Sequence, residues 1–306
     1  MRIASTLVRL ATLLAAALLL ACEPAPANKP LQYSHAPATA SVPVYRLAIH
    51  PLYNPQMLST AYQPLVDHLN SHLTNARVEL EASRDYQAFE EKYTQRQPDF
   101  LLPNPWQTLQ AIKVGYHVIA MAGDAQDFKG IFIVRRDSSI KVPADLKGKV
   151  VSYPSHTALA AAVMPQYFLH SHGISVTRDI QSAYVGSQES AILNVYLGLS
   201  AAGATWPPPW RLFQRDHPKE AADLKVIWET EPLINNSVMV RDDVPEAVRQ
   251  QVKNALLGLS QQPSGAAILQ GMATSGFYAA DDARYGIVDR YIQHFEQVVR
   301  PVGSSK

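Results

Sequence analysis

Ser155 and Thr157, two hydroxyl residues separated by one residue, lie where the chain is best suited to bind an anion. They follow an expected strand at 150–152 and stand where an expected helix at 157–172 begins. A helix N-terminus presents backbone N–H groups without partners and a partial positive charge, so anions bind there. The same pattern also fits a serine that only caps the helix, which contributes about 1 kcal/mol to helix stability.

Two further strand-to-helix junctions carry polar or aromatic residues. Gln188 opens an expected helix at 188–197, and Asn104 and Trp106 follow an expected buried strand at 100–102. Taken singly, these residues fit helix capping or core packing as well as ligand binding. Ligands of open α/β sheets bind beyond the carboxyl ends of the strands, so three such junctions together indicate a binding site.

The elements that position these junctions alternate between strands and helices. Strands are expected at 44–50, 78–80, 100–102, 118–121, 131–134, 150–152, 184–185, 225–228 and 237–240. Helices are expected at 61–73, 87–96, 107–114, 157–172, 188–197, 248–259 and 285–298. This alternation favours an α/β fold with mainly parallel sheets covered by helices on both faces.

The first 21 residues have the pattern of a secretory signal. Arg2 and Arg9 precede an apolar run at 10–21, which is shorter than the about 20 apolar residues that a spanning helix needs. The run ends in Leu-Leu-Ala-Cys22, which resembles a bacterial lipobox, in which cleavage precedes the cysteine and its sulfur carries the lipid. Cys22 is the only cysteine, so the fold contains no disulfide.

The composition of the remaining chain limits its domain organisation and its possible partners. Residues 22–43 are rich in proline, alanine and serine, which predicts an extended tether after the lipidated cysteine. The remaining stretch, about 260 residues, suffices for two lobes with separate cores. Without the signal, 25 basic residues stand against 26 acidic ones, a net charge of −1. There is no basic excess of the kind that nucleic-acid binding needs.

In their order and spacing, these segments resemble the periplasmic binding proteins of phosphate, phosphite and phosphonate ABC transporters. The resemblance covers about 44–292 and rests on the segments 145–150, 155–158, 164–174, 186–192, 202–206, 232–236 and 244–277. It implies a two-lobed type II periplasmic-binding fold, with lobe 1 at 44–130 and 236–300 and lobe 2 at 131–235. Two crossovers near Gly130 and Asn235 would join the lobes, which close on the ligand by a hinge motion.

The resemblance also implies ligand contacts. Ser155 and Thr157, with the backbone N–H groups of His156 and Ala158, would hold the oxyanion, and Gln188 stands where the family often has a ligand-facing histidine. The opposite lobe would contribute Tyr53 or Asn54, and Asn104 or Trp106. Trp206 either lines the cleft or packs against the lobe or a transporter subunit, beside prolines 207–209 that we expect to stiffen a loop.

The implied function is ligand capture by a monomeric protein of the bacterial cell envelope, lipid-anchored and facing the periplasm, that serves an ABC transporter permease. The family commonly has an aspartate where this chain has Ala201, and a second loop serine where it has Ala158. The first departure indicates an oxyanion ligand without an amino group. A sensory lipoprotein of the same fold, which presents a ligand to a signalling receptor, is the alternative.

The sequence contains no pattern typical of a catalytic, metal-binding or cofactor-binding site. Ser155 lacks the Gly-x-Ser-x-Gly context of hydrolases, and the only cysteine belongs to the lipobox. His68 and His72 lie four residues apart on one expected helix without a third ligand, so they fit a solvated helix edge. His156 titrates near neutral pH, and if it faces the ligand, affinity should fall as pH rises.

Overall fold

The computed structural model describes residues 42–303. The expected signal, Cys22 and nearly all of the expected tether lie outside the described residues. Within the described part, no helix combines the length and the apolar character needed to span a membrane.

The first sheet has six strands in the order β11-β4-β10-β3-β1-β2. Strand β1 (Val44–Ile49) pairs in parallel with β2 (Arg77–Glu81) and β3 (Phe100–Leu102). Strand β10 (Ser237–Arg241) lies between β3 and β4 (Tyr116–Ala122) and is antiparallel to both. The short β11 (Phe277–Tyr278) pairs antiparallel with β4 at the edge.

The second sheet has five strands in the order β7-β6-β8-β5-β9. Strand β6 (Val150–Tyr153) pairs in parallel with β7 (Gln181–Tyr184) and β8 (Ala202–Thr205). Strand β5 (Ile131–Arg135) is antiparallel to β8 and to β9 (Leu224–Glu229). Both sheets are therefore mixed, although most strands of each sheet run in the same direction, as expected. The strands that enter from the other lobe, β5 and β10, are inserted antiparallel between their neighbours.

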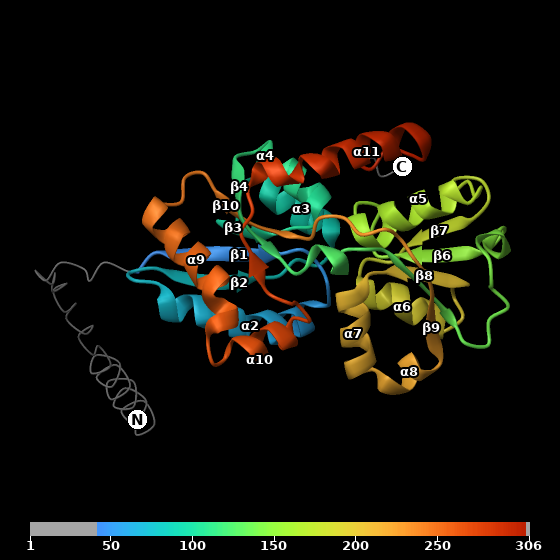
Figure 1. Cartoon of the computed structure of the whole chain (residues 1–306), viewed down its shortest axis with the longest axis horizontal. Coiled ribbons are helices and arrows are strands. Elements are labelled where there is room, and N and C mark those ends of the chain that lie inside the picture. The colour runs from blue at the N-terminus through green and yellow to red at the C-terminus, as the bar shows by residue number, and fades with distance from the viewer. Residues whose placement is uncertain (1–41, 304–306) are drawn as a thin grey trace, which may run out of the picture. The chain divides into compact units, whose positions relative to one another are not determined.

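Helices cover both faces of each sheet (Figure 1). The helices on the two faces of the first sheet are α2 (Pro55–His72), α3 (Tyr86–Thr94), α4 (Pro105–Ile112), α9 (Glu246–Gly258), α10 (Gly265–Gly271) and α11 (Gly286–Val298). The helices on the two faces of the second sheet are α5 (Met164–Ser171), α6 (Gln188–Tyr196), α7 (Pro207–Asp216) and α8 (Pro218–Ala222). The chain passes between the sheets at 123–130 and 230–236. These two segments are joined by hydrogen bonds, among them Leu233 N to Phe128 O at 2.8 Å.

The three consecutive prolines do not stiffen a loop, as the sequence led us to expect. Pro207, Pro208 and Pro209 form the first turn of α7, directly after Trp206. The first backbone N–H groups of a helix have no acceptor within it, so prolines lose no hydrogen bond there, and their fixed φ suits the helix.

The helix expected at 157–172 begins at Leu159 and opens with a π-helical turn, Leu159–Val163, that continues into α5. Pro165 explains the wide turn. It has no N–H, and in an α-helix its ring would press on the carbonyl of Ala161, four residues earlier. The turn also packs closely on the first crossover. A side-chain carbon added at Gly130 would lie 2.6 Å from Ala160 O and 2.7 Å from the ring of Pro165.

Candidate functional site

A small cavity lies between the two lobes. Its walls come from positions that follow parallel strands: His50 after β1, Asn104 after β3, Ala158 after β6, Gln188 after β7 and Trp206 after β8. The other lining residues are Tyr86, Phe128, Leu159, Ala160, Ala161 and Asn236. The cavity thus occupies the place at which open α/β sheets bind their ligands.

The second lobe contributes free backbone donors to this cavity. The amides of Leu159, Ala160 and Ala161 have no hydrogen-bond acceptor among residues 42–303, and all three residues line the cavity. The amide of Ala158 donates to Ser155 O at 3.2 Å, so it is not the free donor that the sequence suggested. Because the helix starts later than expected, the unpaired amides lie further along the chain.

One hydroxyl group of the loop, that of Thr157, contacts a carboxyl group of the other lobe. Thr157 Oγ1 donates to Glu90 Oε1 at 2.6 Å, and Gln107 Nε2 donates to the same oxygen at 3.0 Å. Ser155 Oγ lies 3.1 Å from Thr157 Oγ1 and accepts from the amide of Thr157 at 3.3 Å. Burial raises the pKa of Glu90 above its ordinary value, although hydrogen bonds from Thr157 and Gln107 oppose the shift. Sequence reasoning missed Glu90.

Asn104 and Gln188 line the cavity, as expected, and each also reaches across the lobes. Asn104 Oδ1 caps α4 by accepting from Gln107 N at 3.0 Å, while its Nδ2 donates to Thr157 O at 3.1 Å. Gln188 Oε1 accepts from Thr205 Oγ1 at 2.8 Å, and its Nε2 donates to Tyr86 OH at 3.1 Å. The bond from Thr205 fixes the carboxamide of Gln188 with its nitrogen toward the first lobe.

His50 and Asn236 belong to the cavity wall although sequence reasoning did not select them as ligand contacts. His50 Nδ1 lies 2.8 Å from Leu102 O and must carry the hydrogen, because a carbonyl only accepts. Burial lowers the pKa of His50 to about 4, despite the opposing bond to Leu102, so the ring is neutral at pH 7. Asn236 is 3% exposed, and its Oδ1 has no hydrogen-bond partner among the described residues.

The remaining expected contacts lie at varying distances from the cavity. Trp206 lines it and packs on Phe128, with ring centroids 5.5 Å apart. Asn54 caps α2 and donates to Glu189 Oε2 at 3.3 Å, between the lobes. Tyr53 lines a separate small pocket, and Trp106 is buried without lining the cavity. The ligand contacts assigned to these residues stay predictions.

His156 does not line the cavity. Its ring packs edge-on against Tyr184, with centroids 5.9 Å apart, and its carbonyl accepts from Arg300 Nη2 at 2.9 Å. Burial, and secondarily Arg300, lower the pKa of His156. His68 Nε2 is 3.1 Å from Ala255 O, and residues 42–303 contain no group of side chains that could hold a metal ion.

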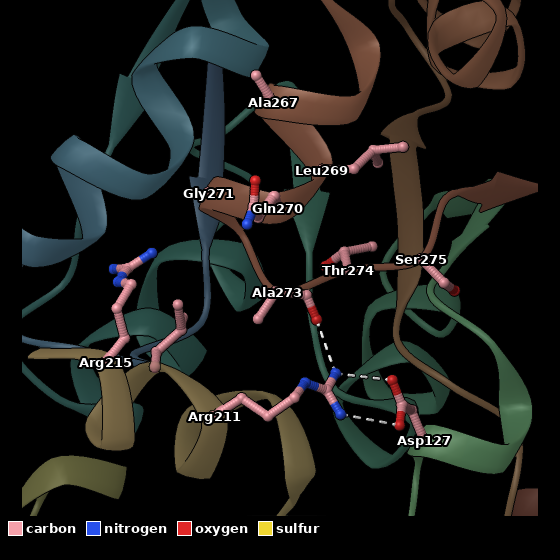
Figure 2. Close-up of a pocket in the computed structure, with 11 residues that line it drawn as sticks. Asp127, Arg211, Arg215, Ala267, Leu269, Gln270, Gly271, Ala273, Thr274 and Ser275 are labelled. Carbon is pink, nitrogen blue, oxygen red and sulfur yellow. Dashed lines mark hydrogen bonds and ion pairs between the residues drawn. The ribbon is translucent and has the colours of Figure 1, made fainter. Parts of the chain in front are cut away.

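A wider, open hollow between α7 and α10 is a poorer anion site despite its two arginines (Figure 2). Arg211 forms a two-pronged pair with Asp127, at 2.8 and 3.1 Å, and also donates to Ala273 O at 2.9 Å. Arg215 pairs with Asp216 at 2.6 Å. Since both guanidinium groups already have carboxylate partners, the hollow offers a ligand little uncompensated positive charge.

Comparison with known proteins agrees with this architecture. A family model described as the periplasmic substrate-binding protein of phosphonate ABC transporters matches residues 47–285. Among curated proteins, the chain is 25% identical over 181 residues to a probable ABC transporter phosphite binding protein, PhnD1, of Prochlorococcus marinus (strain MIT 9301). That match covers 55% of this chain and 61% of the relative, which is less than two thirds of the relative's length.

Solved structures share the fold at low sequence identity. A binding protein component of an ABC phosphonate transporter from Pseudomonas aeruginosa superposes with a TM-score of 0.77 at 15% identity, covering 84% of this chain and 87% of that one. PhnD1 from Prochlorococcus marinus, in complex with methylphosphonate, superposes with a TM-score of 0.75 at 21% identity, covering 83% of this chain and 99% of that one. These similarities confirm the predicted two-lobed binding-protein fold.

Proposed function

Because the chain belongs to the family of periplasmic substrate-binding proteins of phosphonate ABC transporters, we propose that its interlobe cavity binds a small phosphorus oxyanion for delivery to a permease. The observation that carries the proposal is the set of three unpaired amides, at Leu159, Ala160 and Ala161, in the cavity wall. Such amides at the start of a helix stabilise a negative charge without needing a cationic side chain.

The lining of the cavity also bears on which oxyanion fits. It contains no Asp or Glu and no Lys or Arg. An ammonium group on the ligand would therefore meet no carboxylate among the lining residues. We propose a phosphonate, phosphite or phosphate ligand without an amino group.

A thermal-shift and calorimetric screen tests this function. Phosphite, phosphate or methylphosphonate should raise the melting temperature, because a ligand that binds only the folded state stabilises it, whereas 2-aminoethylphosphonate should not. Gln188→Glu, which adds a negative charge inside the cavity, should weaken binding at least a hundredfold. Gln181→Glu adds the same charge at an exposed position of β7 and should leave binding unchanged. A carboxylate or sugar as the sole hit would contradict the ligand class.

We propose that the protein acts without catalysis, as a monomer held at the membrane by lipid on Cys22. In support of the first point, Ser155 Oγ contacts Thr157 and no imidazole, so it lacks the base that a serine nucleophile needs. The lipobox-like end of the signal supports the lipid anchor on Cys22. Intact-mass analysis should find acyl chains on the wild type and none on Cys22→Ser, which should appear in the soluble periplasmic fraction.

A further inference from the structure

Two hydrogen-bond acceptors on the cavity wall of the first lobe have no donor. The neutral ring of His50 uses Nδ1–H on Leu102 O, so its Nε2 can only accept, and no group among residues 42–303 donates to it. Asn236 Oδ1 is buried, and no donor in the described part of the chain reaches it either. Both residues line the same cavity as the unpaired amides of the second lobe.

The side chains around His50 keep its ring neutral. Its ring packs edge-on against Tyr86 and Phe89 of α3, with centroids 6.0 and 6.5 Å away, and the residue is 2% exposed. Tyr86 is the one titratable side chain among these contacts, and burial raises its pKa, so it stays neutral. No carboxylate is in hydrogen-bond contact with His50 to favour the imidazolium. Nε2 is therefore an acceptor over the neutral pH range.

The two walls of the cavity thus differ in hydrogen-bonding character. The second lobe offers backbone donors, which suit the bare oxygens of an anion. The first lobe offers His50 Nε2, which can only accept, so it repels a bare oxygen and matches an O–H group; Asn236 Oδ1 is a second acceptor beside it. A buried acceptor left without a donor costs about 1–3 kcal/mol, so a ligand that fills this need gains selectivity over one that does not.

We propose that His50 and Asn236 form an acceptor subsite that selects oxyanions still carrying a hydrogen, such as the P–OH of a phosphonate monoanion. The inference rests on the proposed function, since it specifies which form of the oxyanion the cavity takes. It predicts discrimination against sulfonates, which have the same tetrahedral shape and single negative charge but no hydrogen to donate.

The test compares methylphosphonate with methanesulfonate by calorimetry at about pH 5, below the second ionisation of phosphorus oxyanions, which is about pH 6 for phosphate monoesters. Both ligands are then mainly monoanions. The wild type should bind methylphosphonate at least tenfold more tightly. His50→Asn keeps a donor for Leu102 O but removes Nε2, and Asn236→Ala removes Oδ1. Each should bring the affinity ratio to within about threefold of one, whereas Asn254→Ala, at an exposed position of α9, should preserve it.

The possible outcomes are distinct. Equal affinities of the wild type for the two ligands would overturn the acceptor subsite and leave oxyanion binding intact. An unchanged ratio in both variants would overturn it as well. Absence of binding of methylphosphonate, phosphite and phosphate alike would instead contradict the proposed function, and the subsite with it. Melting curves of the variants show whether each one is folded, and if His50→Asn fails to fold, Asn236→Ala decides alone.

Discussion

The carboxyl group of Glu90 and the hydroxyl of Thr157 lie 2.6 Å apart, although they belong to opposite lobes. A hydroxyl has a single hydrogen to donate, so while Thr157 donates to Glu90 it cannot also donate to a ligand. The interaction therefore leaves the free amides of the π-helical turn as the main anion donors of the loop. It also joins the two lobes directly beside the cavity.

Replacing Glu90 tests how burial acts on this carboxyl group. Because burial raises its pKa, the folded state holds the proton more firmly than the unfolded state. The resulting stability is present at low pH and is lost as pH rises through the raised value. Glu90→Gln cannot ionise, so its melting temperature should rise relative to the wild type between about pH 4 and pH 8. Glu91→Gln, exposed on the same helix, should show no such trend, and a pH-independent difference for Glu90→Gln would refute the assignment.

His50 should make the stability of the protein depend on pH in the opposite direction. Its pKa is lowered from 6.5 to about 4, so the unfolded state binds the proton more readily. The contribution to stability is complete above about pH 6.5 and is lost as pH falls toward about 4, amounting to at most about 3 kcal/mol. Urea unfolding across this range should show a steeper loss for the wild type than for His50→Asn. Parallel curves would show that the imidazole is not buried in its neutral form.

Arg300 should help to hold the lobes together. Its Nε donates to Gln166 Oε1 at 2.7 Å, and its Nη2 donates to His156 O at 2.9 Å, so the segment after α11 reaches the second lobe. Arg300→Ala should shift the unliganded protein toward an open form, seen as a larger radius of gyration in X-ray scattering. Ligand affinity should fall by about ten- to a hundredfold, the loss expected for hydrogen bonds from a charged group.

The matched control for Arg300 is Arg290, which is exposed on α11. Arg290→Ala removes the same charge without removing a contact between the lobes, so the scattering profile and the affinity should stay those of the wild type. An Arg300→Ala variant that is as compact as Arg290→Ala would show that the contact does not hold the closed form.

Pro165 should matter for binding more than for stability. With Pro165→Ala, the residue regains an N–H and the ring no longer presses on the preceding turn, so a regular α-helical turn becomes possible. The amides of Leu159, Ala160 and Ala161 would then point elsewhere, and affinity for phosphite or methylphosphonate should fall at least tenfold. Unchanged affinity in a folded variant would mean that the π-helical turn does not position the donors.

Local sequence patterns predicted the elements better than they predicted the cavity. The helix at 188–197 is observed as α6, and Gln188 and Asn104 line the cavity because each stands after a parallel strand, at the start of the helix that follows it. The same rule could have found His50, which directly follows β1. Glu90 had no local signal, since it lies within a helix and meets Thr157 across 67 positions of sequence.

The errors in the prediction have physical causes. Prolines are typical of loops, yet the first turn of a helix tolerates them, as α7 shows with Pro207, Pro208 and Pro209. The late start of the helix at Leu159 depends on Pro165, six positions downstream, whose effect on the preceding turn is not part of any helix-start pattern. The reversed strands β5 and β10 depend on how the chain crosses between lobes, which periodicity does not report.

Arg300 places a buried positive charge between the lobes in the closed form. Burial lowers the pKa of Arg300, and no carboxylate among residues 42–303 forms an ion pair with it, so closing the lobes strips hydration from a charge that receives only neutral acceptors in return. An anion held by the amides just beyond His156 would attract that cation through a poorly screened interior and offset the lost hydration. Cargo and closure then favour each other even where they share no contact, and the interlobe hydrogen bonds of Arg300 hold the lobes more firmly once the anion is bound.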